Sequence, residues 1–273
     1  MILLLDIGNT NLRWATAEAA NPGEMQVLRH SDGIPLDLLA AWEQIDAPSR
    51  ILVSNVRGTA IADALRRVTR AYWGLEPEFV STCAESCRVR IAYADPTRFG
   101  VDRWLVLIAA HALAQDAVCP TSAPDASADT SRPTLILDAG TAVTFDLLLA
   151  DGRHLGGLIL PGIEMMRNSL LAGTQIPKIE AEPVGDPWAC DTGTGVASGS
   201  IQAIVALTAR LYGRLAEQTG ILPRLLLTGG DADRLHPVLD QPCEVIPDLV
   251  LRGLLQLITN QRGSGKASRS TLL

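Results

Sequence analysis

Residues 3–10 read Leu-Leu-Leu-Asp-Ile-Gly-Asn-Thr, and this stretch decides the fold that we expect for the chain. The apolar run from Met1 to Leu5 predicts a strand that is buried on both faces. Asp6 follows the run, and the Gly-Asn-Thr of residues 8–10 is typical of a turn. A glycine lets a phosphate approach the backbone, turn amides and a Thr hydroxyl can donate to it, and a carboxylate can hold hydrated Mg²⁺. The stretch therefore predicts a site for a metal-bound phosphate.

The same pattern occurs a second time near the middle of the chain. Residues 135–144 read Leu-Ile-Leu-Asp-Ala-Gly-Thr-Ala-Val-Thr, so Asp138 ends another apolar strand 132 positions after Asp6. One Asp-x-Gly turn is a weak signal, but two at half-chain spacing indicate two homologous halves that face one nucleotide. A third apolar strand, residues 224–228, ends in Gly229-Gly230-Asp231, and we interpret this glycine pair as a place for the nucleoside.

Strands alternate with segments of helical spacing, which favours an α/β fold with mixed sheets. Segment 119–133 is rich in Pro, Ser, Ala and Asp and is typical of a linker. We therefore predict an N-terminal domain at 1–118, a C-terminal domain at 134–259 and a flexible polar tail at 260–273. Neither Gly-x-x-x-x-Gly-Lys-Ser/Thr nor a Gly-x-Gly-x-x-Gly after the first strand is present, which excludes a P-loop kinase and disfavours a Rossmann dinucleotide site.

Composition narrows the class of protein. The 273 residues are 47% hydrophobic, enough for a large core, but no apolar run reaches the about 18 residues that a membrane helix needs. Met1–Leu5 is too short for the apolar region of a signal peptide. The five cysteines have no zinc-site spacing, and we expect them to be free thiols in the cytoplasm. The net charge of −7 disfavours nucleic-acid binding.

Five short motifs carry a resemblance that spans nearly the whole chain. They are Asp-Ile-Gly-Asn-Thr-Asn-Leu-Arg (6–13), Gly-Val-Asp-Arg-Trp (100–104), Asp-Ala-Gly-Thr-Ala-Val-Thr (138–144), Gly-Gly-x-Ile-x-Pro-Gly (156–162) and Thr-Gly-Gly-Asp (228–231). In this order they resemble the type III pantothenate kinases. The resemblance implies two actin-like (ribonuclease H-like) domains, each a mixed sheet flanked by helices, with the nucleotide cleft between them. It also implies ATP-dependent phosphorylation of pantothenate to 4'-phosphopantothenate, the first step of coenzyme A biosynthesis.

The resemblance also implies a role for individual residues. Asp102 would be the general base that acts on the pantothenate hydroxyl. The residues expected to bind ATP are Asp6, Ile7, Gly8, Asn9, Thr10, Asn11, Leu12, Arg13 and Thr141. The residues expected to bind pantothenate are Tyr93, Gly100, Val101, Asp102, Arg103 and Thr192.

Two cations and a dimer complete what the resemblance implies. Asp138 would ligate a monovalent cation, K⁺ or NH₄⁺, and Asp6 would hold Mg²⁺, directly or through water. Thr192 would reach pantothenate from the partner subunit of a homodimer with a shared active site. The long apolar helix expected over 196–211 could pack across the twofold axis of that dimer. No nucleic acid or membrane partner is expected.

The residues themselves support a role for Asp102. Phosphoryl transfer depends mostly on positioning and charge neutralisation, so a carboxylate with an ordinary pKa near 4 can orient a hydroxyl and take its proton late. A helix N-terminus would keep Asp102 ionised, and Arg103 beside it can pair with a carboxylate or a phosphate. Other readings stay open: Asp102 as a helix cap, Arg13 as a solvated strand residue, and Tyr93 as a loop-packing aromatic.

Two other functions stay open as well. The chain could be another acid or sugar kinase of the same superfold, or a regulator that kept the fold without catalysis. Intact carboxylates at Asp6, Asp102 and Asp138 favour an enzyme, because a binding protein has no need of all three. Four histidines lie in no motif, and we interpret them as structural or surface residues: His30, His111, His154 and His236.

Overall fold

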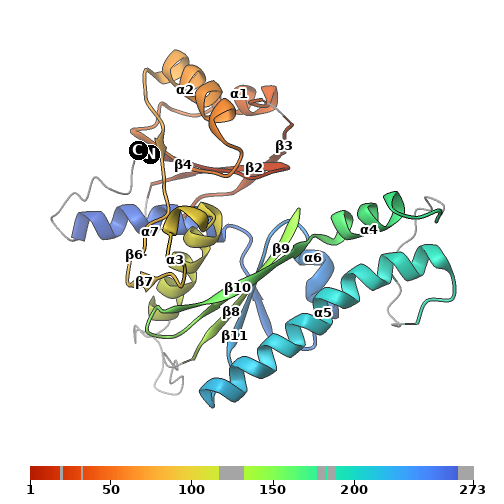
Figure 1. The fold of residues 1–273 in the computed structure, drawn as a ribbon. Coiled ribbons are helices and arrows are strands. Elements are labelled where there is room, and N and C mark those ends of the chain that lie inside the picture. The colour runs from red at the N-terminus through yellow and green to blue at the C-terminus, as the bar shows by residue number, and fades with distance from the viewer. Residues whose placement is uncertain (19–20, 32, 117–131, 177–182, 184–187, 264–273) are drawn as a thin grey trace. The chain divides into compact units, whose positions relative to one another are not determined.

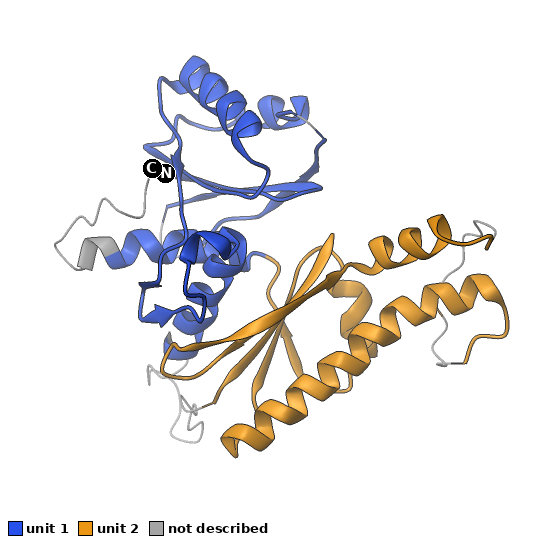
Figure 2. Cartoon of the chain, viewed as in Figure 1, with its two compact units in different colours: residues 1–121, 248–273 blue, residues 122–247 orange. Residues whose placement is uncertain are grey.

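The computed structural model describes residues 1–18, 21–31, 33–116, 132–176, 183 and 188–263. Most of the predicted linker at 119–133 and of the predicted tail at 260–273 lies outside the described residues. The chain forms two compact units (Figure 2). Unit 1 consists of Met1–Thr121 together with Asp248–Leu273, and unit 2 of Ser122–Pro247.

Unit 1 is built on a five-stranded mixed sheet in the order β3-β2-β1-β4-β5. Strands β2, β3 and β4 are labelled in Figure 1, together with helices α1 and α2 of the same unit. The central strand β1 pairs antiparallel with β2 and parallel with β4. Leu3, Leu5 and Ile7 of β1 are fully buried and belong to a core that includes side chains of both flanking helices. The elements are β1 (Ile2–Ile7), β2 (Asn11–Ala17), β3 (Gln26–Arg29), α1 (Leu36–Trp42), β4 (Arg50–Asn55), α2 (Thr59–Trp73) and β5 (Glu78–Phe79).

Unit 2 repeats this sheet strand for strand, in the order β10-β9-β8-β11-β12. Its central strand β8 pairs antiparallel with β9 and parallel with β11, as β1 does with β2 and β4. The duplication predicted from the two Asp-x-Gly turns is therefore present in the topology. The elements are β8 (Thr134–Ala139), β9 (Ala142–Leu148), β10 (His154–Pro161), α4 (Ile163–Ala172), α5 (Thr192–Thr219), β11 (Arg224–Thr228), α6 (Ala232–Leu235), η2 (His236–Val238) and β12 (Cys243–Val245).

The predicted fold class, two mixed α/β sheets flanked by helices, is confirmed, and the cleft between the domains stays a prediction. Several short strands were not predicted: β3, β12 and the hairpin β6 (Glu85–Ser86) and β7 (Val89–Arg90). None of them carries a long apolar run. Within the described part of the chain, no helix is long and apolar enough to cross a membrane.

Helix α7 (Leu249–Gly263) belongs to unit 1, although we predicted residues 249–259 as part of the C-terminal domain. It packs against α3 (Val101–Asp116) and against β1 and β4. A Cβ atom on Gly253 would lie 2.2 Å from the carbonyl oxygen of Leu105, so the two helices meet backbone to backbone at a residue that has no side chain. Helical spacing identified this helix, but apolar periodicity does not specify which sheet it covers.

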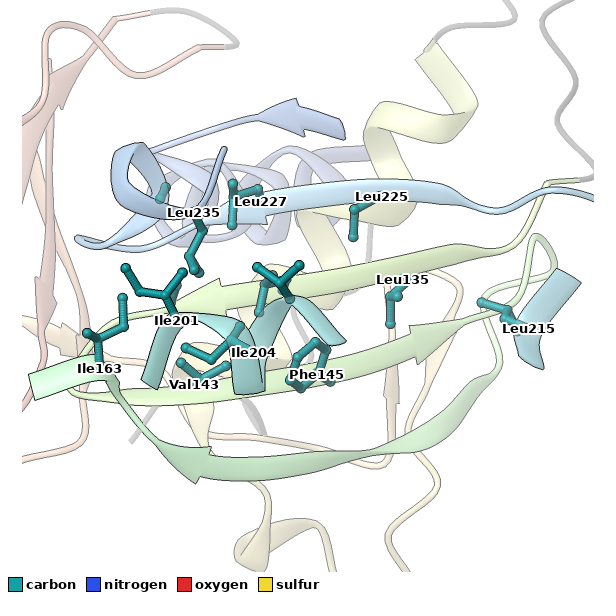
Figure 3. Close-up of a cluster of buried hydrophobic side chains, with 14 residues drawn as sticks. Leu135, Val143, Phe145, Ile163, Ile201, Ile204, Leu215, Leu225, Leu227 and Leu235 are labelled. Atoms are coloured by element: carbon teal, nitrogen blue, oxygen red, sulfur yellow. The ribbon is translucent and has the colours of Figure 1, made fainter. Parts of the chain in front are cut away.

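The core of unit 2 lies between its sheet and helix α5 (Figure 3). Ile201 and Ile204 of α5 point toward Val143 and Phe145 of β9 in this view. Leu207 and Leu211 pack against the same core. The apolar face of α5 therefore covers its own sheet, and packing of this helix across a twofold axis stays a prediction.

Candidate functional site

The first Asp-x-Gly turn joins β1 to β2. Asp6 on β1 lies opposite Arg13 on β2, and the two side chains form an ion pair with 3.5 Å between Asp6 Oδ2 and Arg13 Nη1. The Gly8 amide closes the turn by donating to the carbonyl oxygen of Asn11 at 3.0 Å. The antiparallel pairing of the two strands thus places the Asp6 carboxylate and the Arg13 guanidinium at the base of the turn.

Asp6 is only 3% exposed, and its surroundings do not fully compensate its charge. The pKa of Asp6 is raised to about 6: burial and the negative charge of Asp102 raise it, while the positive charge of Arg13 and the nearby Ser54 hydroxyl lower it. Asp6 Oδ1 is buried and has no hydrogen-bond partner among the described residues. A buried carboxylate oxygen of this kind can accept a cation or a hydrated metal, since the energetic cost of leaving it unpaired is high.

His30, which follows β3, braces the first turn from the side. Its backbone amide donates to the carbonyl oxygen of Thr10 at 3.1 Å, and its ring Nε2 lies 2.9 Å from the carbonyl oxygen of Gly8. A carbonyl oxygen only accepts, so Nε2 carries the proton in this contact. This structural role agrees with the interpretation of His30 as a structural or surface residue, but the contact itself was not predicted, because His30 belongs to no motif and lies 22 positions from Gly8 along the chain.

The second Asp-x-Gly turn joins β8 to β9 and is held by backbone contacts from two other segments. The Gly140 amide donates to the carbonyl oxygen of Ala142 at 3.0 Å. The acceptor lies two residues after the glycine here, whereas in the turn of unit 1 it lies three residues after the glycine. A Cβ on Gly162 would lie 2.1 Å from the carbonyl oxygen of Gly140, and one on Gly229 would lie 2.2 Å from that of Ala139. Both glycines therefore allow other backbone segments to pack against the turn that follows Asp138.

This packing gives Gly229 a structural role, while the place of the nucleoside stays a prediction. We interpreted the pair Gly229-Gly230 as a place for the nucleoside, but Gly229 adopts φ +96° and lies against the backbone of Ala139. The Asp231 amide donates to the carbonyl oxygen of Ala139 at 2.9 Å in the same contact. Supporting the second turn is thus a structural reason for a glycine at 229.

Asp102 lies in the first turn of α3, as predicted. Its Oδ1 accepts from the Arg103 amide at 2.8 Å, while the Trp104 amide donates to the carbonyl oxygen of Gly100 at 3.0 Å. A Cβ on Gly100 would lie 2.5 Å from Asp102 Oδ1, so the carboxylate folds back over a residue that has no side chain. Asp102 and Asp6 belong to the same unit and interact electrostatically.

Arg103 and Tyr93 meet around Phe99, which is 2% exposed. The guanidinium carbon of Arg103 lies 4.5 Å from the centroid of the Phe99 ring. The Tyr93 ring contacts Phe99 edge to face, with 4.9 Å between the ring centroids and 65° between their planes. Arg103 Nη1 also donates a long hydrogen bond of 3.5 Å to the Tyr93 hydroxyl. Two residues of the predicted acceptor site are therefore brought together, and Phe99 is a neighbour that no motif indicated.

The predicted site residues divide between the two units. Asp6–Arg13, Tyr93 and Gly100–Arg103 lie in unit 1. Asp138, Thr141 and Thr192 lie in unit 2, where Asp138 is half-buried at the end of β8 and Thr141 is exposed in the turn. Thr192 is exposed at the start of α5, next to Asp191, which caps this helix by accepting from the Thr194 amide at 2.9 Å.

The residues present suit a cation that arrives with phosphates. Among the described residues, no group of three or more His, Cys, Asp or Glu side chains is placed to hold a metal ion. Mg²⁺ is commonly bound by one or two carboxylates together with substrate phosphates and water, and does not need a cage of protein ligands. The unpaired Oδ1 of Asp6 fits this mode of binding.

Comparison with known proteins gives a consistent result. A sequence model of the type III pantothenate kinase family matches residues 2–214. The type III pantothenate kinase of Nitrosococcus oceani is 35% identical over 274 residues, covering 99% of this chain and 97% of that protein. The type III pantothenate kinase of Nitrosospira multiformis is 31% identical over 271 residues, covering 97% of this chain and 94% of that protein.

A solved structure shares the fold at lower identity. It is described as a Baf family transcriptional activator from Campylobacter jejuni, and it matches with a TM-score of 0.56 and 20% identity. The match covers 96% of this chain and 99% of that chain. At this identity the likeness concerns the fold alone.

Proposed function

The chain belongs to the type III pantothenate kinase family, and from this premise we propose that Asp102 activates the acceptor hydroxyl of pantothenate. The family reaction is the transfer of a phosphoryl group from ATP to pantothenate, which gives 4'-phosphopantothenate in the first step of coenzyme A biosynthesis. The chain is thus a kinase, a transferase whose acceptor is an alcohol. The observation that carries the role of Asp102 is its placement in the first turn of α3, electrostatically coupled to the buried Asp6.

The proposed base needs little more than correct placement. Phosphoryl transfer proceeds with weak bonding to the incoming oxygen, so the base mainly orients the hydroxyl and accepts its proton late. Asp102 Oδ1 is held by the Arg103 amide at 2.8 Å, which fixes the carboxylate relative to the helix. The partial positive charge of a helix N-terminus favours the ionised carboxylate.

The acceptor is proposed to bind beside this base. Arg103 supplies a guanidinium that can pair with the carboxylate of pantothenate, and Tyr93 supplies a hydroxyl next to that guanidinium. Gly100 and Val101 form the backbone at the start of α3, where a bound hydroxyl would face Asp102. Thr192 is proposed to complete the acceptor site from the partner subunit, which agrees with its exposure at the start of α5.

ATP is proposed to bind at the two Asp-x-Gly turns. Amides and hydroxyls in residues 6–13, the Arg13 guanidinium and Thr141 would contact the phosphates. Asp6 would hold Mg²⁺ through its unpaired Oδ1, and the cation would neutralise negative charge that develops on the phosphate oxygens. Asp138 occupies in unit 2 the position that Asp6 has in unit 1, and we propose it as the ligand of a monovalent cation, K⁺ or NH₄⁺.

A homodimer with a shared active site is also proposed, as expected from the resemblance. Large apolar side chains are exposed on the edge strand β10 and on α4, among them Leu158, Ile159, Met165 and Leu170. Large exposed apolar side chains on two elements that contact each other agree with an interface in this region. A cytoplasmic location, which we propose as well, agrees with the free thiols among the described residues.

The proposal is tested by coupling ATP consumption to the acceptor. The purified chain should consume ATP only when pantothenate is present, and a panel of other acids and sugars should be poor substrates. Asp102→Asn should lower kcat by about 10²- to 10⁴-fold, the usual contribution of general base catalysis, and leave ATP binding in calorimetry unchanged. Undiminished turnover by the Asn variant would exclude Asp102 as the base. ATP binding without turnover on any acceptor would favour a non-catalytic regulator instead.

A further inference from the structure

Phe99 touches both side chains that are proposed to hold the acceptor, although it lies in none of the sequence motifs. Its ring is 4.5 Å from the guanidinium carbon of Arg103 and 4.9 Å from the centroid of the Tyr93 ring. Tyr93 and Arg103 in turn contact each other through a hydrogen bond of 3.5 Å. The three side chains thus form a closed set of contacts, which we call the Phe99 cluster.

The physical setting makes the ring–guanidinium contact strong. A guanidinium over an aromatic face is attracted by the negative charge of the ring face, and the attraction grows when water is excluded. Arg103 is 5% exposed and Phe99 is 2% exposed, so little water competes. The edge-to-face contact with Tyr93 is the preferred geometry for an aromatic pair.

The backbone of Phe99 is itself anchored. Its amide donates to the carbonyl oxygen of Pro96 at 3.0 Å, and its carbonyl oxygen accepts from Thr82 Oγ1 at 2.9 Å. The segment before it, η1 (Pro96–Arg98), is capped by Asp95, whose Oδ1 accepts from the Thr97 amide at 3.0 Å. These hydrogen bonds therefore fix the backbone that carries the Phe99 ring.

We propose that Phe99 is a positioning residue for the acceptor substrate. It holds the guanidinium of Arg103 and the hydroxyl of Tyr93 in one arrangement before the substrate binds, so an anionic acceptor meets a preformed pair. Without the ring, the long Arg103 side chain would gain rotamers, and part of the binding free energy would be spent on ordering it. This inference rests on the proposed acceptor site and adds a residue that acts through Arg103 and Tyr93.

The cluster is predicted to affect acceptor binding and not chemistry. Asp102, the proposed base, accepts a hydrogen bond from the Arg103 backbone amide, and this contact does not involve the Phe99 ring. Loss of the ring should therefore raise KM for pantothenate while kcat and KM for ATP remain near the parent values. A residue with a merely structural role would change all three parameters together, or only the thermal stability.

The test compares two phenylalanines that make the same kind of contact in unit 1. Phe99→Leu removes the ring from the cluster, and Phe79→Leu removes a ring that lies 4.7 Å from the guanidinium carbon of Arg66, on a different pair of elements. We expect Phe99→Leu to raise KM for pantothenate about fivefold and Phe79→Leu to leave it within twofold of the parent. Thermal unfolding checks that both variants fold, and Phe99→Met, of similar volume, replaces the Leu variant if that one does not.

A double-mutant cycle then tests whether Phe99 acts through Arg103. In an Arg103→Gln background, Phe99→Leu should change kcat/KM for pantothenate by clearly less than it does in the parent, because the guanidinium is gone and only the contact with Tyr93 remains. Three results would each overturn the inference. The first is that the fold-changes in kcat/KM caused by Phe99→Leu and Arg103→Gln simply multiply in the double variant. The others are an unchanged KM for pantothenate in folded Phe99→Leu and an equal effect of Phe79→Leu. A parent chain that does not phosphorylate pantothenate would instead overturn the proposed function, and this inference with it.

Discussion

Replacing Asp6 by Asn should stabilise the ligand-free protein while impairing it as an enzyme. Asp6 is buried, its Oδ1 is unpartnered among the described residues, and Arg13 compensates its charge only in part, at 3.5 Å. An Asn side chain has nearly the same shape and carries no charge, so the desolvation penalty of the carboxylate disappears. Mg²⁺ and the phosphates of ATP would lose their proposed ligand in the same step.

The size of this stabilisation follows from the pKa of Asp6, which rises from 3.8 to about 6 in the folded protein. Each pKa unit corresponds to about 1.4 kcal/mol, so the folded state loses about 3 kcal/mol when Asp6 ionises fully. A carboxyl whose pKa is raised by folding stabilises the fold below the unfolded pKa, and this stability is lost as the pH rises through the folded pKa. About half of this 3 kcal/mol of stability is lost at pH 5, and nearly all of it is lost at pH 8.

The assay is urea unfolding of parent and Asp6→Asn at pH 5 and pH 8, with EDTA present and no nucleotide. The advantage of the Asn variant should be about 1.5 kcal/mol larger at pH 8 than at pH 5. Asp37→Asn removes an exposed carboxylate in the first turn of α1 and serves as the control for a change in net charge. If Asp6→Asn is no more stable than the parent at pH 8, or if its advantage does not depend on pH, Asp6 is not the strained buried charge described above.

Three further changes test other parts of the site. His30→Ala should raise KM for ATP about twofold to tenfold, because the ring no longer holds the Gly8 carbonyl, and His30→Gln should recover part of the loss; an unchanged KM for ATP in steady-state assays would contradict this. Gly229→Ala should lower the free energy of unfolding by about 2–4 kcal/mol, since a Cβ would collide with the Ala139 backbone at a positive φ; a variant that melts with the parent would refute the contact. Exchange of K⁺ for Na⁺ should raise KM for ATP in the parent and have little effect in Asp138→Asn, and equal responses of the two proteins would remove Asp138 as the cation ligand.

The sheets and the two Asp-x-Gly turns were predictable because the sequence patterns that indicate them are short and continuous. A continuous apolar run such as residues 135–137, followed by Asp138 and a glycine turn, determines both a buried strand and the place where it ends. The repeat of that pattern from Asp6 to Asp138 predicted two similar halves, and the strand order is indeed the same in both sheets. The start of α3 was predictable for the same reason, since the residues around Gly100 indicate both the helix and the place of Asp102 in its first turn.

Features that depend on distant partners could not be predicted in this way. His30 reaches the Gly8 turn across 22 positions, and nothing in its own neighbourhood indicates the contact. Gly229 resembles a ligand-binding glycine in sequence, whereas its φ and its contact with Ala139 exist only in the folded chain. The hairpin of β6 and β7 turns through Cys87 and Arg88, both at positive φ, although neither residue type favours that conformation.

Helix α7 has a consequence for the order in which the chain can fold on the ribosome. Unit 2 is one continuous segment, but unit 1 is completed by α7, which is translated only after all of unit 2. Domains usually fold in the order in which they emerge from the ribosome. Here unit 1 cannot complete its packing until α7 is made, because α7 packs against α3. Nascent chains of this protein should therefore present an incomplete unit 1 to chaperones until α7 has emerged from the ribosome.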